Sequence, residues 1–407
     1  MTTGPLAAGA APPAARRSTA IDAVRGLVMV IMALDHVRDF IHHGAMVASP
    51  TDLATTTPLL FFTRWITHLC APAFSFTAGL GAYLWWQRGG RSRGALSRFL
   101  LTRGLWLVLL ELTVMRLAYN FNLSGAYPVL LLVLWVLGGC MILLAALVWL
   151  PPAMLAGLSL LLIAGHDLLD GIAPQRFGAA APLWNILHQP GGFGLGGVIV
   201  VVGYPLVPWV AVMALGFVAG RLYQLALAAR QRVLLRAGVA ATLGFVALRA
   251  LNGYGDPAPW SPQASGTFTV LSFLNTTKYP PSLAFLLMTL GPTCLLLAWA
   301  ERRQLPGTHP LVVFGRVPLF YFIVHFYAAH LASVALAFAR YGADAARFVL
   351  QPVLSMGGPK DLIPADFGAG LGVTYLVWAA IVAGLYPLCR WYAGVKARRR
   401  SWWLSYL

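Results

Sequence analysis

The sequence predicts an all-α, polytopic integral membrane protein with about ten transmembrane helices. Of its 407 residues, 59% are hydrophobic and only 10% are charged, and the mean hydropathy is +0.74. Soluble domains usually carry about a quarter charged residues. Apolar stretches of roughly the 20 residues needed to cross a bilayer also recur along the chain. These observations exclude a soluble enzyme, a disordered protein and a secreted disulfide-rich scaffold.

The apolar stretches are expected to be helices, because in lipid a helix satisfies its backbone polar groups within one segment. The ten expected spans are Ile21–His42, Leu59–Trp86, Phe99–Leu117, Pro128–Leu150, Ala153–Leu169, Gly197–Leu222, Ala237–Leu251, Ser282–Ala300, Leu311–Phe338 and Ala369–Tyr392. The fifth and seventh spans are short, so the number of crossings stays open.

The basic residues predict the orientation of these spans. About two thirds of the 29 Lys and Arg residues lie at the inner ends of the spans if the N-terminus is cytoplasmic, as the positive-inside rule requires. We therefore expect both termini in the cytoplasm and the protein in the inner (cytoplasmic) membrane. A disordered tail is expected over 1–20, a transmembrane domain over 21–393 and a basic tail over 394–407. Since topology explains the net charge of +17, no nucleic-acid partner is expected.

The cysteines give no sign of a metal site. The four of them lie far apart in apolar segments without CxxC spacing, at Cys70, Cys140, Cys294 and Cys389. Such cysteines behave as small buried hydrophobic residues. No disulfide and no bound metal are therefore expected.

The first span carries the strongest candidates for chemistry. Asp35 and His36 lie about 22 Å from its inner end at the rise of an α-helix, and ionisable residues at such depth default to a functional role. His36, Asp39 and His43 fall on one helical stripe. A carboxylate one turn from an imidazole can fix its tautomer, as a general base requires. For His42 and His43, a polar cluster near the lipid headgroups fits equally well.

Three other spans place ionisable side chains at a similar depth, which are His68, Glu111 and His325. One buried histidine is more often a hydrogen-bonded core residue than a catalyst. Four ionisable groups in one layer, with His36 as the fourth, favour a shared polar cavity.

Several short motifs follow one another along the chain: Ile21–Gly26 with Asp35-His36, Cys70–Gly79, Tyr204–Trp209, Phe273–Ser282, and Phe314–Phe320 followed by His325. In this order they resemble the catalytic domain of the heparan-α-glucosaminide N-acetyltransferase family of membrane acyltransferases. The resemblance covers most of 21–392 and is strongest in the first two spans.

The resemblance implies transfer of an acetyl group from cytoplasmic acetyl-CoA to an amino-sugar or other glycan acceptor on the outer side. It also implies a catalytic histidine near the outer end of the first span, a position that His42 or His43 matches best. This chain has His36 where the lysosomal member has an asparagine. His36, His42 and His43 therefore stay open as the catalyst, with Asp35, Asp39 and His325 as supporting candidates.

The coenzyme and the reaction set further requirements. A histidine can act as the base or can itself be acylated and then discharged, and the sequence does not choose between these routes. Coenzyme A carries phosphates, for which a basic cluster on the inner side is available at Arg88, Arg91, Arg93 and Arg98. Taken singly, each of these arginines fits a contact with anionic lipid equally well.

A second class of function uses the same residues. In a proton-coupled transporter or channel, the buried His and Asp side chains would form a relay. The order of the motifs and the absence of a visible repeat favour the enzyme. The expected partners are membrane lipid, acyl-CoA and the sugar acceptor, and the formation of a homodimer stays open.

Overall fold

The computed structural model describes residues 18–123, 127–356, 358–399 and 401. Most of the tail expected over 1–20, and the end of the one over 394–407, lie outside these residues. The α-helices are α1 Thr19–Ile41, α2 His43–Val47, α3 Pro58–Trp65, α4 Cys70–Gln87, α5 Arg93–Leu110, α6 Arg116–Asn120, α7 Val133–Leu147, α8 Pro152–Gly165, α9 Ala181–Leu187, α10 Leu206–Ala219, α11 Leu227–Leu251, α12 Gly266–Leu274, α13 Leu283–Arg303, α14 Pro310–Arg316, α15 Pro318–Tyr341 and α16 Leu371–Arg398.

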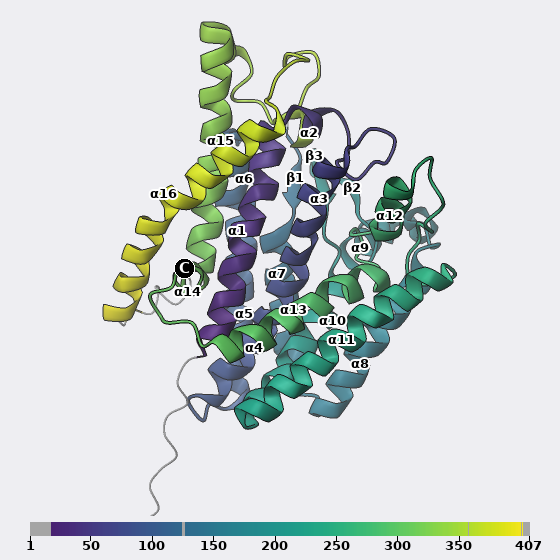
Figure 1. The fold of residues 1–407 in the computed structure, drawn as a ribbon, viewed down its shortest axis with the longest axis vertical. Helices are drawn as coiled ribbons and strands as arrows, with labels where there is room; N and C mark the ends of the chain where they lie inside the picture. Colours follow the sequence, from purple (N-terminus) through teal and green to yellow (C-terminus); the bar gives the residue numbers. More distant parts are fainter. Residues whose placement is uncertain (1–17, 124–126, 357, 400, 402–407) are drawn as a thin grey trace, which may run out of the picture.

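Shorter helical turns extend or connect these helices. They are η1 Ile66–Leu69, η2 Glu111–Met115, η3 His166–Leu169, η4 Pro174–Ala180, η5 Gly220–Gln224, η6 Gly342–Arg347 and η7 Leu354–Met356. Together the elements form a bundle in which α1 runs through the middle, flanked by α15 and α16 on one side and by α10, α11 and α13 on the other (Figure 1).

Among the described residues, six helical segments are long and apolar enough to cross a membrane. They are Pro152–Leu169, Leu206–Gln224, Leu227–Leu251, Leu283–Arg303, Pro318–Arg347 and Leu371–Arg398. The other four expected spans are also largely helical, but they are shorter, interrupted or more polar. The chain is thus a multi-pass membrane protein, and the total of ten crossings stays a prediction.

A small sheet interrupts the otherwise helical fold. Strands β1 (Val129–Leu131), β2 (Gly191–Leu195) and β3 (Val198–Val202) pair in the order β1-β3-β2, with β1 and β3 parallel. The expectation of helix throughout Pro128–Leu150 and Gly197–Leu222 was therefore wrong at their first residues. The sequence Val-Ile-Val-Val-Val in β3 is β-branched throughout, and such side chains favour a pleated strand.

Helix α1 is packed closely along its inner half. Gly26 of α1 faces the backbone of Leu311, and Gly315 of α14 faces the backbone of Asp22, so that a Cβ atom at either glycine would collide with main-chain atoms. Small residues permit such close approach of helices in membranes. The contact fixes α1 against the segment that leads into α15.

The outer end of α1 differs from the expected continuous stripe. The helix ends at Ile41, and His42 adopts an extended conformation before α2 begins at His43. The His43 N–H donates to the Ala369 carbonyl oxygen at 3.1 Å, and the Ala369 N–H donates to the Ile41 carbonyl oxygen at 2.7 Å. Because this backbone pairing breaks the helix, His43 does not extend the stripe of His36.

Helices α1 and α16 place both ends of the helical bundle on one side. The start of α1 and the end of α16 lie toward the same end of the molecule (Figure 1). An even number of crossings would give this arrangement. Which face is cytoplasmic stays a prediction from the distribution of charge.

Candidate active site within the helical bundle

A cavity of about 420 Å³ lies between α1, α4, α5, α7 and α15. This volume falls within the usual range for small-molecule sites. Four arginines line it, which are Arg25, Arg88, Arg91 and Arg103. The remaining wall is mainly apolar and includes Met29, Leu137 and Phe322. The cavity thus combines an apolar chamber with several cationic groups.

The structure brings only part of the expected basic cluster to this cavity. Arg88 and Arg91 line it, whereas Arg93 and Arg98 do not. Arg93 donates to the Trp149 carbonyl oxygen at 3.0 Å, and Arg98 is exposed. The four arginines were grouped because they lie close together in the sequence, in one loop and the first turns of α5. The rotation of this helix directs Arg98 away from the cavity.

Two histidines from distant helices meet in the middle of the bundle. His36 Nδ1 lies 2.7 Å from His325 Nε2, and His325 Nδ1 lies 2.9 Å from the Tyr321 carbonyl oxygen. The carbonyl oxygen can only accept, so a neutral His325 is protonated on Nδ1 and accepts on Nε2. His36 then donates from Nδ1, and its Nε2 keeps the lone pair. This is the tautomer that a general base requires.

The histidine pair adjoins the deep end of the cavity. The ring of Phe322, which lines the cavity, lies edge-on to His36 with the ring centroids 6.0 Å apart. Met29, another lining residue, precedes His36 by seven positions, or two helical turns, and so lies on the same face of α1. Phe322 therefore contacts both the cavity and the His36–His325 pair.

The acids of α1 bind arginines rather than histidines. Asp35 forms ion pairs with Arg64 of α3 and with Arg38, the latter at 2.8 Å, and Asp39 binds the same Arg38 nitrogen at 2.6 Å. The expectation that Asp39 orients an imidazole was therefore wrong, because Arg38 engages its carboxylate. The network instead braces α3 against α1 beside His36.

A group of residues near the pair, formed by Lys278, Tyr204 and Tyr279, was not predicted from the sequence. Lys278 is buried, with its Nζ 5.8 Å from the ring centre of Tyr204 and 5.2 Å from that of Tyr279. The two tyrosine hydroxyls lie 3.3 Å apart. Lys278 is also close enough to Asp35 and His36 to interact with their charges. The available signal was that two of the family-like motifs contain these three residues.

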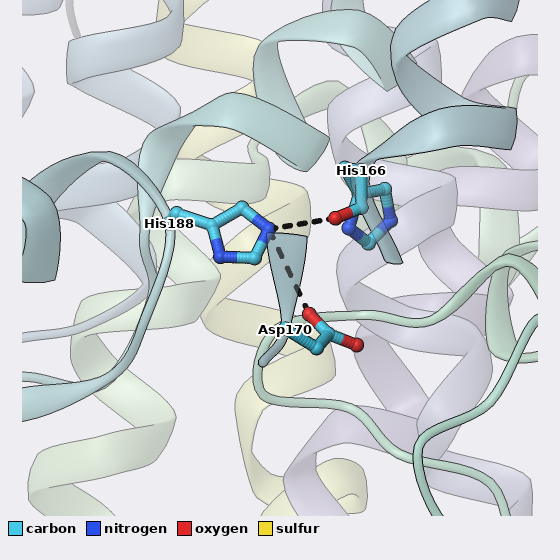
Figure 2. Close-up of side chains that lie close together, drawn as sticks. All are labelled: His166, Asp170 and His188. Atoms are coloured by element: carbon cyan, nitrogen blue, oxygen red, sulfur yellow. Dashed lines mark hydrogen bonds and ion pairs between the residues drawn. The ribbon is translucent and has the colours of Figure 1, made fainter. Parts of the chain in front are cut away.

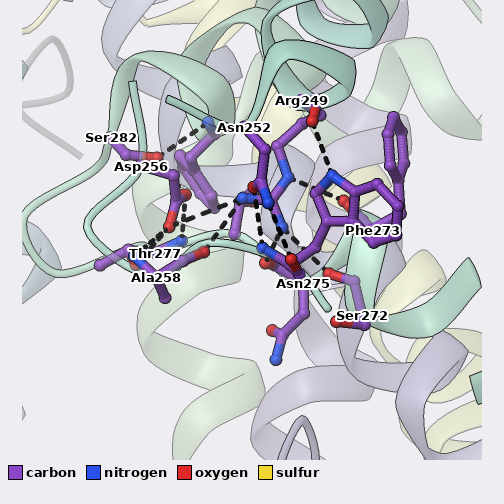
Figure 3. A network of polar contacts seen from close by, with 12 residues as sticks. Arg249, Asn252, Asp256, Ala258, Ser272, Phe273, Asn275, Thr277 and Ser282 are labelled. Carbon is purple, nitrogen blue, oxygen red and sulfur yellow. Dashed lines mark hydrogen bonds and ion pairs between the residues drawn. The ribbon is translucent and has the colours of Figure 1, made fainter. Parts of the chain in front are cut away.

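A polar network holds the loop that carries Lys278 (Figure 3). The guanidinium of Arg249 donates to the carbonyl oxygens of Phe273, Ala258, Ser272 and Asn275. Asp256 accepts hydrogen bonds from the backbone and hydroxyl of Thr277 and from the hydroxyl of Ser282. These bonds fix both ends of the segment that contains Lys278 and Tyr279.

The sequence profile of a family described as "Heparan-alpha-glucosaminide N-acetyltransferase, catalytic" matches residues 17–254, more than half of the chain. The chain belongs to this family of membrane acetyltransferases. A search of curated proteins found no match. The matched region contains the first-helix histidines, Arg64 and the arginines of the cavity. Lys278 and His325 lie outside the matched region. It is the structure that shows them next to His36, which lies inside it.

The two outer histidines occupy a different position from the central pair. His42 is buried with no hydrogen bond to its Nδ1 within the described residues, whereas His43 is exposed. Their ring centroids lie 5.7 Å apart. Within the part of the chain that the structure describes, no hydrogen bond or ring contact joins these two side chains to the His36–His325 pair.

Glu111 and His68 are the other two residues that were expected to share one layer with His36 and His325. Glu111 accepts hydrogen bonds from the Tyr119 hydroxyl and from the backbone N–H groups of Leu134 and Trp135. It thereby caps the N-terminus of α7, where a carboxylate is favoured by the helix dipole. The inclusion of Glu111 in a shared polar cavity was therefore wrong. His68 is buried against Phe285, on the side of Arg64 and Lys278.

Proposed function

We propose that this protein transfers an acetyl group from cytoplasmic acetyl-CoA to an amino-sugar or other glycan acceptor on the outer side of the membrane. One observation carries the proposal: Phe322 lines the arginine-containing cavity and also packs against the His36–His325 pair. Lys278 and the two tyrosines also lie near this pair, because Lys278 is close enough to His36 to interact with its charge. A donor in the cavity and an acceptor from the other membrane face would then meet at His36.

The cavity fits the two halves of the donor. Phosphate groups of coenzyme A would bind Arg25, Arg88, Arg91 and Arg103, because guanidinium groups form strong charge-assisted hydrogen bonds with phosphate oxygens. The apolar wall would hold the pantetheine arm and direct the thioester toward Phe322. Arg25 is already oriented by its bonds to the hydroxyl and carbonyl oxygens of Thr77.

The histidine pair supplies the proton transfers. His36 Nε2 takes a proton from the acceptor amine or hydroxyl as that atom attacks the thioester carbonyl carbon. The new bond to carbon forms, the carbon–sulfur bond breaks, and the protonated imidazole returns its proton to the leaving thiolate. His325 accepts from His36 Nδ1 and stabilises the transient imidazolium. Direct transfer of this kind uses the tautomer that these hydrogen bonds assign, without requiring an acylated histidine.

Binding of acetyl-CoA is expected to depend on arginines of the cavity rather than on the basic cluster as a whole. Arg103→Gln should weaken acetyl-CoA binding roughly tenfold or more, since a charge-assisted hydrogen bond contributes about 1.5–3 kcal/mol. The measurement is isothermal titration calorimetry of the purified full chain in detergent. Arg98→Gln, on the same helix but outside the cavity, is the matched control and should bind as the wild type does.

Two results would contradict this assignment. Equal losses in Arg98→Gln and Arg103→Gln would indicate a diffuse charge effect instead of a site. No binding of acetyl-CoA to the wild type would remove the donor from the proposal and favour a proton relay through the same histidines.

A further inference from the structure

A second cluster of titratable side chains lies away from the candidate active site, beyond the outer end of α8. His166 begins η3, Asp170 follows that turn, and His188 follows α9. Figure 2 shows the side chains of His166 and Asp170, from the two ends of one turn, converging with that of His188 from a separate segment. One imidazole nitrogen of each histidine and one carboxylate oxygen of Asp170 all lie within 4.8 Å of one another. Side-chain rotations that move these atoms by about an ångström or two would place all three around one ion.

The donor atoms of this cluster are buried and poorly satisfied by the protein. His166 is 2% exposed and His188 is 0% exposed. Among the described residues, neither ring nitrogen of His166 makes a hydrogen bond of acceptable geometry, and Asp170 Oδ1 and His188 Nδ1 make none either. His188 Nε2 lies 3.0 Å from the His166 carbonyl oxygen and 3.7 Å from Asp170 Oδ1. Buried polar atoms without partners are rare in folded proteins and call for an explanation.

A fourth donor adjoins the three. Asp167 Oδ1, which is also buried without a hydrogen bond, lies 3.2 Å from His166 Nε2. Two neutral imidazoles and two carboxylates balance the charge of a divalent cation. Nitrogen and oxygen donors in this number are typical of tetrahedral Zn²⁺ sites, and imidazole ligands favour late first-row metals over Mg²⁺ or Ca²⁺.

We propose that His166, Asp170 and His188, assisted by Asp167, form a binding site for a divalent first-row metal ion of the Zn²⁺ type. No metal was expected from the sequence because the cysteines lack a ligand spacing, and these histidines, which stand 22 positions apart, were not considered. Only the packing of α9 beside the end of α8 reveals the cluster. This site does not depend on the proposed acetyl transfer.

The site would join three segments on the outer side of the molecule. Asp167 Oδ2 accepts from the backbone N–H of Leu283, the first residue of α13. Directly before this residue comes the segment that carries Lys278 and Tyr279. A metal ion would therefore tie α8, the α9 segment and the start of α13 together. Its binding should stabilise the folded protein, because an ion that binds only the native state shifts unfolding by mass action.

The test uses the full-length wild type without a polyhistidine tag, washed with chelator and kept in detergent. Addition of Zn²⁺ should raise the melting temperature by several degrees, with one ion bound per chain in calorimetry. Addition of Co²⁺ should give the visible absorption bands of a tetrahedral complex. His188→Gln and Asp170→Asn should each weaken Zn²⁺ affinity roughly a hundredfold or more, since loss of even an outer-shell partner costs about 10–100-fold.

His330→Gln is the matched control. His330 is also buried, with its Nδ1 2.7 Å from the Ala118 carbonyl oxygen, and this variant should bind Zn²⁺ as the wild type does. The proposal is overturned if the wild type shows neither a Zn²⁺-dependent shift nor Co²⁺ absorption, a result that needs no variant to fold. Equal Zn²⁺ affinity in the wild type and in folded His188→Gln and Asp170→Asn would also overturn it.

Discussion

Replacement of His36 by alanine should lower the rate of acetyl transfer by roughly a hundredfold or more, the usual loss when a general base is removed. Binding of acetyl-CoA should persist, because His36 lies beyond Phe322 and does not line the cavity. His325→Ala should give a smaller loss, since His36 would keep its Nε2 lone pair but lose the partner that fixes its tautomer. The measurement is transfer of labelled acetyl from acetyl-CoA to glucosamine by the reconstituted protein.

The control for this series is His330→Gln. His330 lies on the same helix as His325, but its ring stacks on Phe40 and Phe121, so this variant should transfer at nearly the wild-type rate. Asp39→Asn should cause a modest loss, because the carboxylate acts on Arg38 rather than on an imidazole. Full activity in His36→Ala would contradict the assignment and direct attention to His42 and His43.

The largest expected effect on stability belongs to Arg64. Arg64→Met should lower the free energy of unfolding by about 3 kcal/mol, since it leaves the carboxylates of Asp35 and Asp39 to share one guanidinium, that of Arg38. The side chains of Arg64 and Asp35 are only 14% and 11% exposed. Unfolding would be followed by denaturant titration of the full chain in mixed micelles.

Two further variants separate charge from packing. Arg64→Met combined with Asp35→Asn should recover part of the loss, because the amide needs no counter-charge. Arg347→Met breaks the exposed pair with Asp344, whose side chains are 79% and 72% exposed, and should cost about 0–1 kcal/mol. Similar losses for Arg64→Met and Arg347→Met would show that the Arg64–Asp35 pair is not the brace that the contacts indicate.

The multi-pass helical architecture could be predicted because it depends on the amino-acid composition, which is read directly from the sequence. The contact between His36 and His325 could also be anticipated, because the rise per residue of an α-helix places both side chains at a similar depth. Depth alone does not give the direction in which a side chain faces. Glu111 has the right depth yet caps α7, and His43 has the right spacing yet follows a break that pairing with Ala369 imposes.

The remaining site residues depend on contacts between segments far apart in the chain. Arg25 and Arg103 reach the cavity from two different helices, and neither has a spacing signature that links it to Arg88. Lys278 lies on a loop that the Arg249 and Asp256 network holds in place. Sequence periodicity describes one helix at a time, so it cannot predict which faces of different helices meet.

The most direct test of the account is a sided transfer assay in sealed proteoliposomes. Labelled acetyl-CoA is supplied only to the face that carries Arg88 and Arg91, and a glucosamine acceptor only to the opposite face, with orientation checked by cysteine labelling of the 88–98 loop. The account predicts acetylated acceptor on the side opposite to the donor, and its loss in His36→Ala. Transfer that occurs only when donor and acceptor share one face would contradict it.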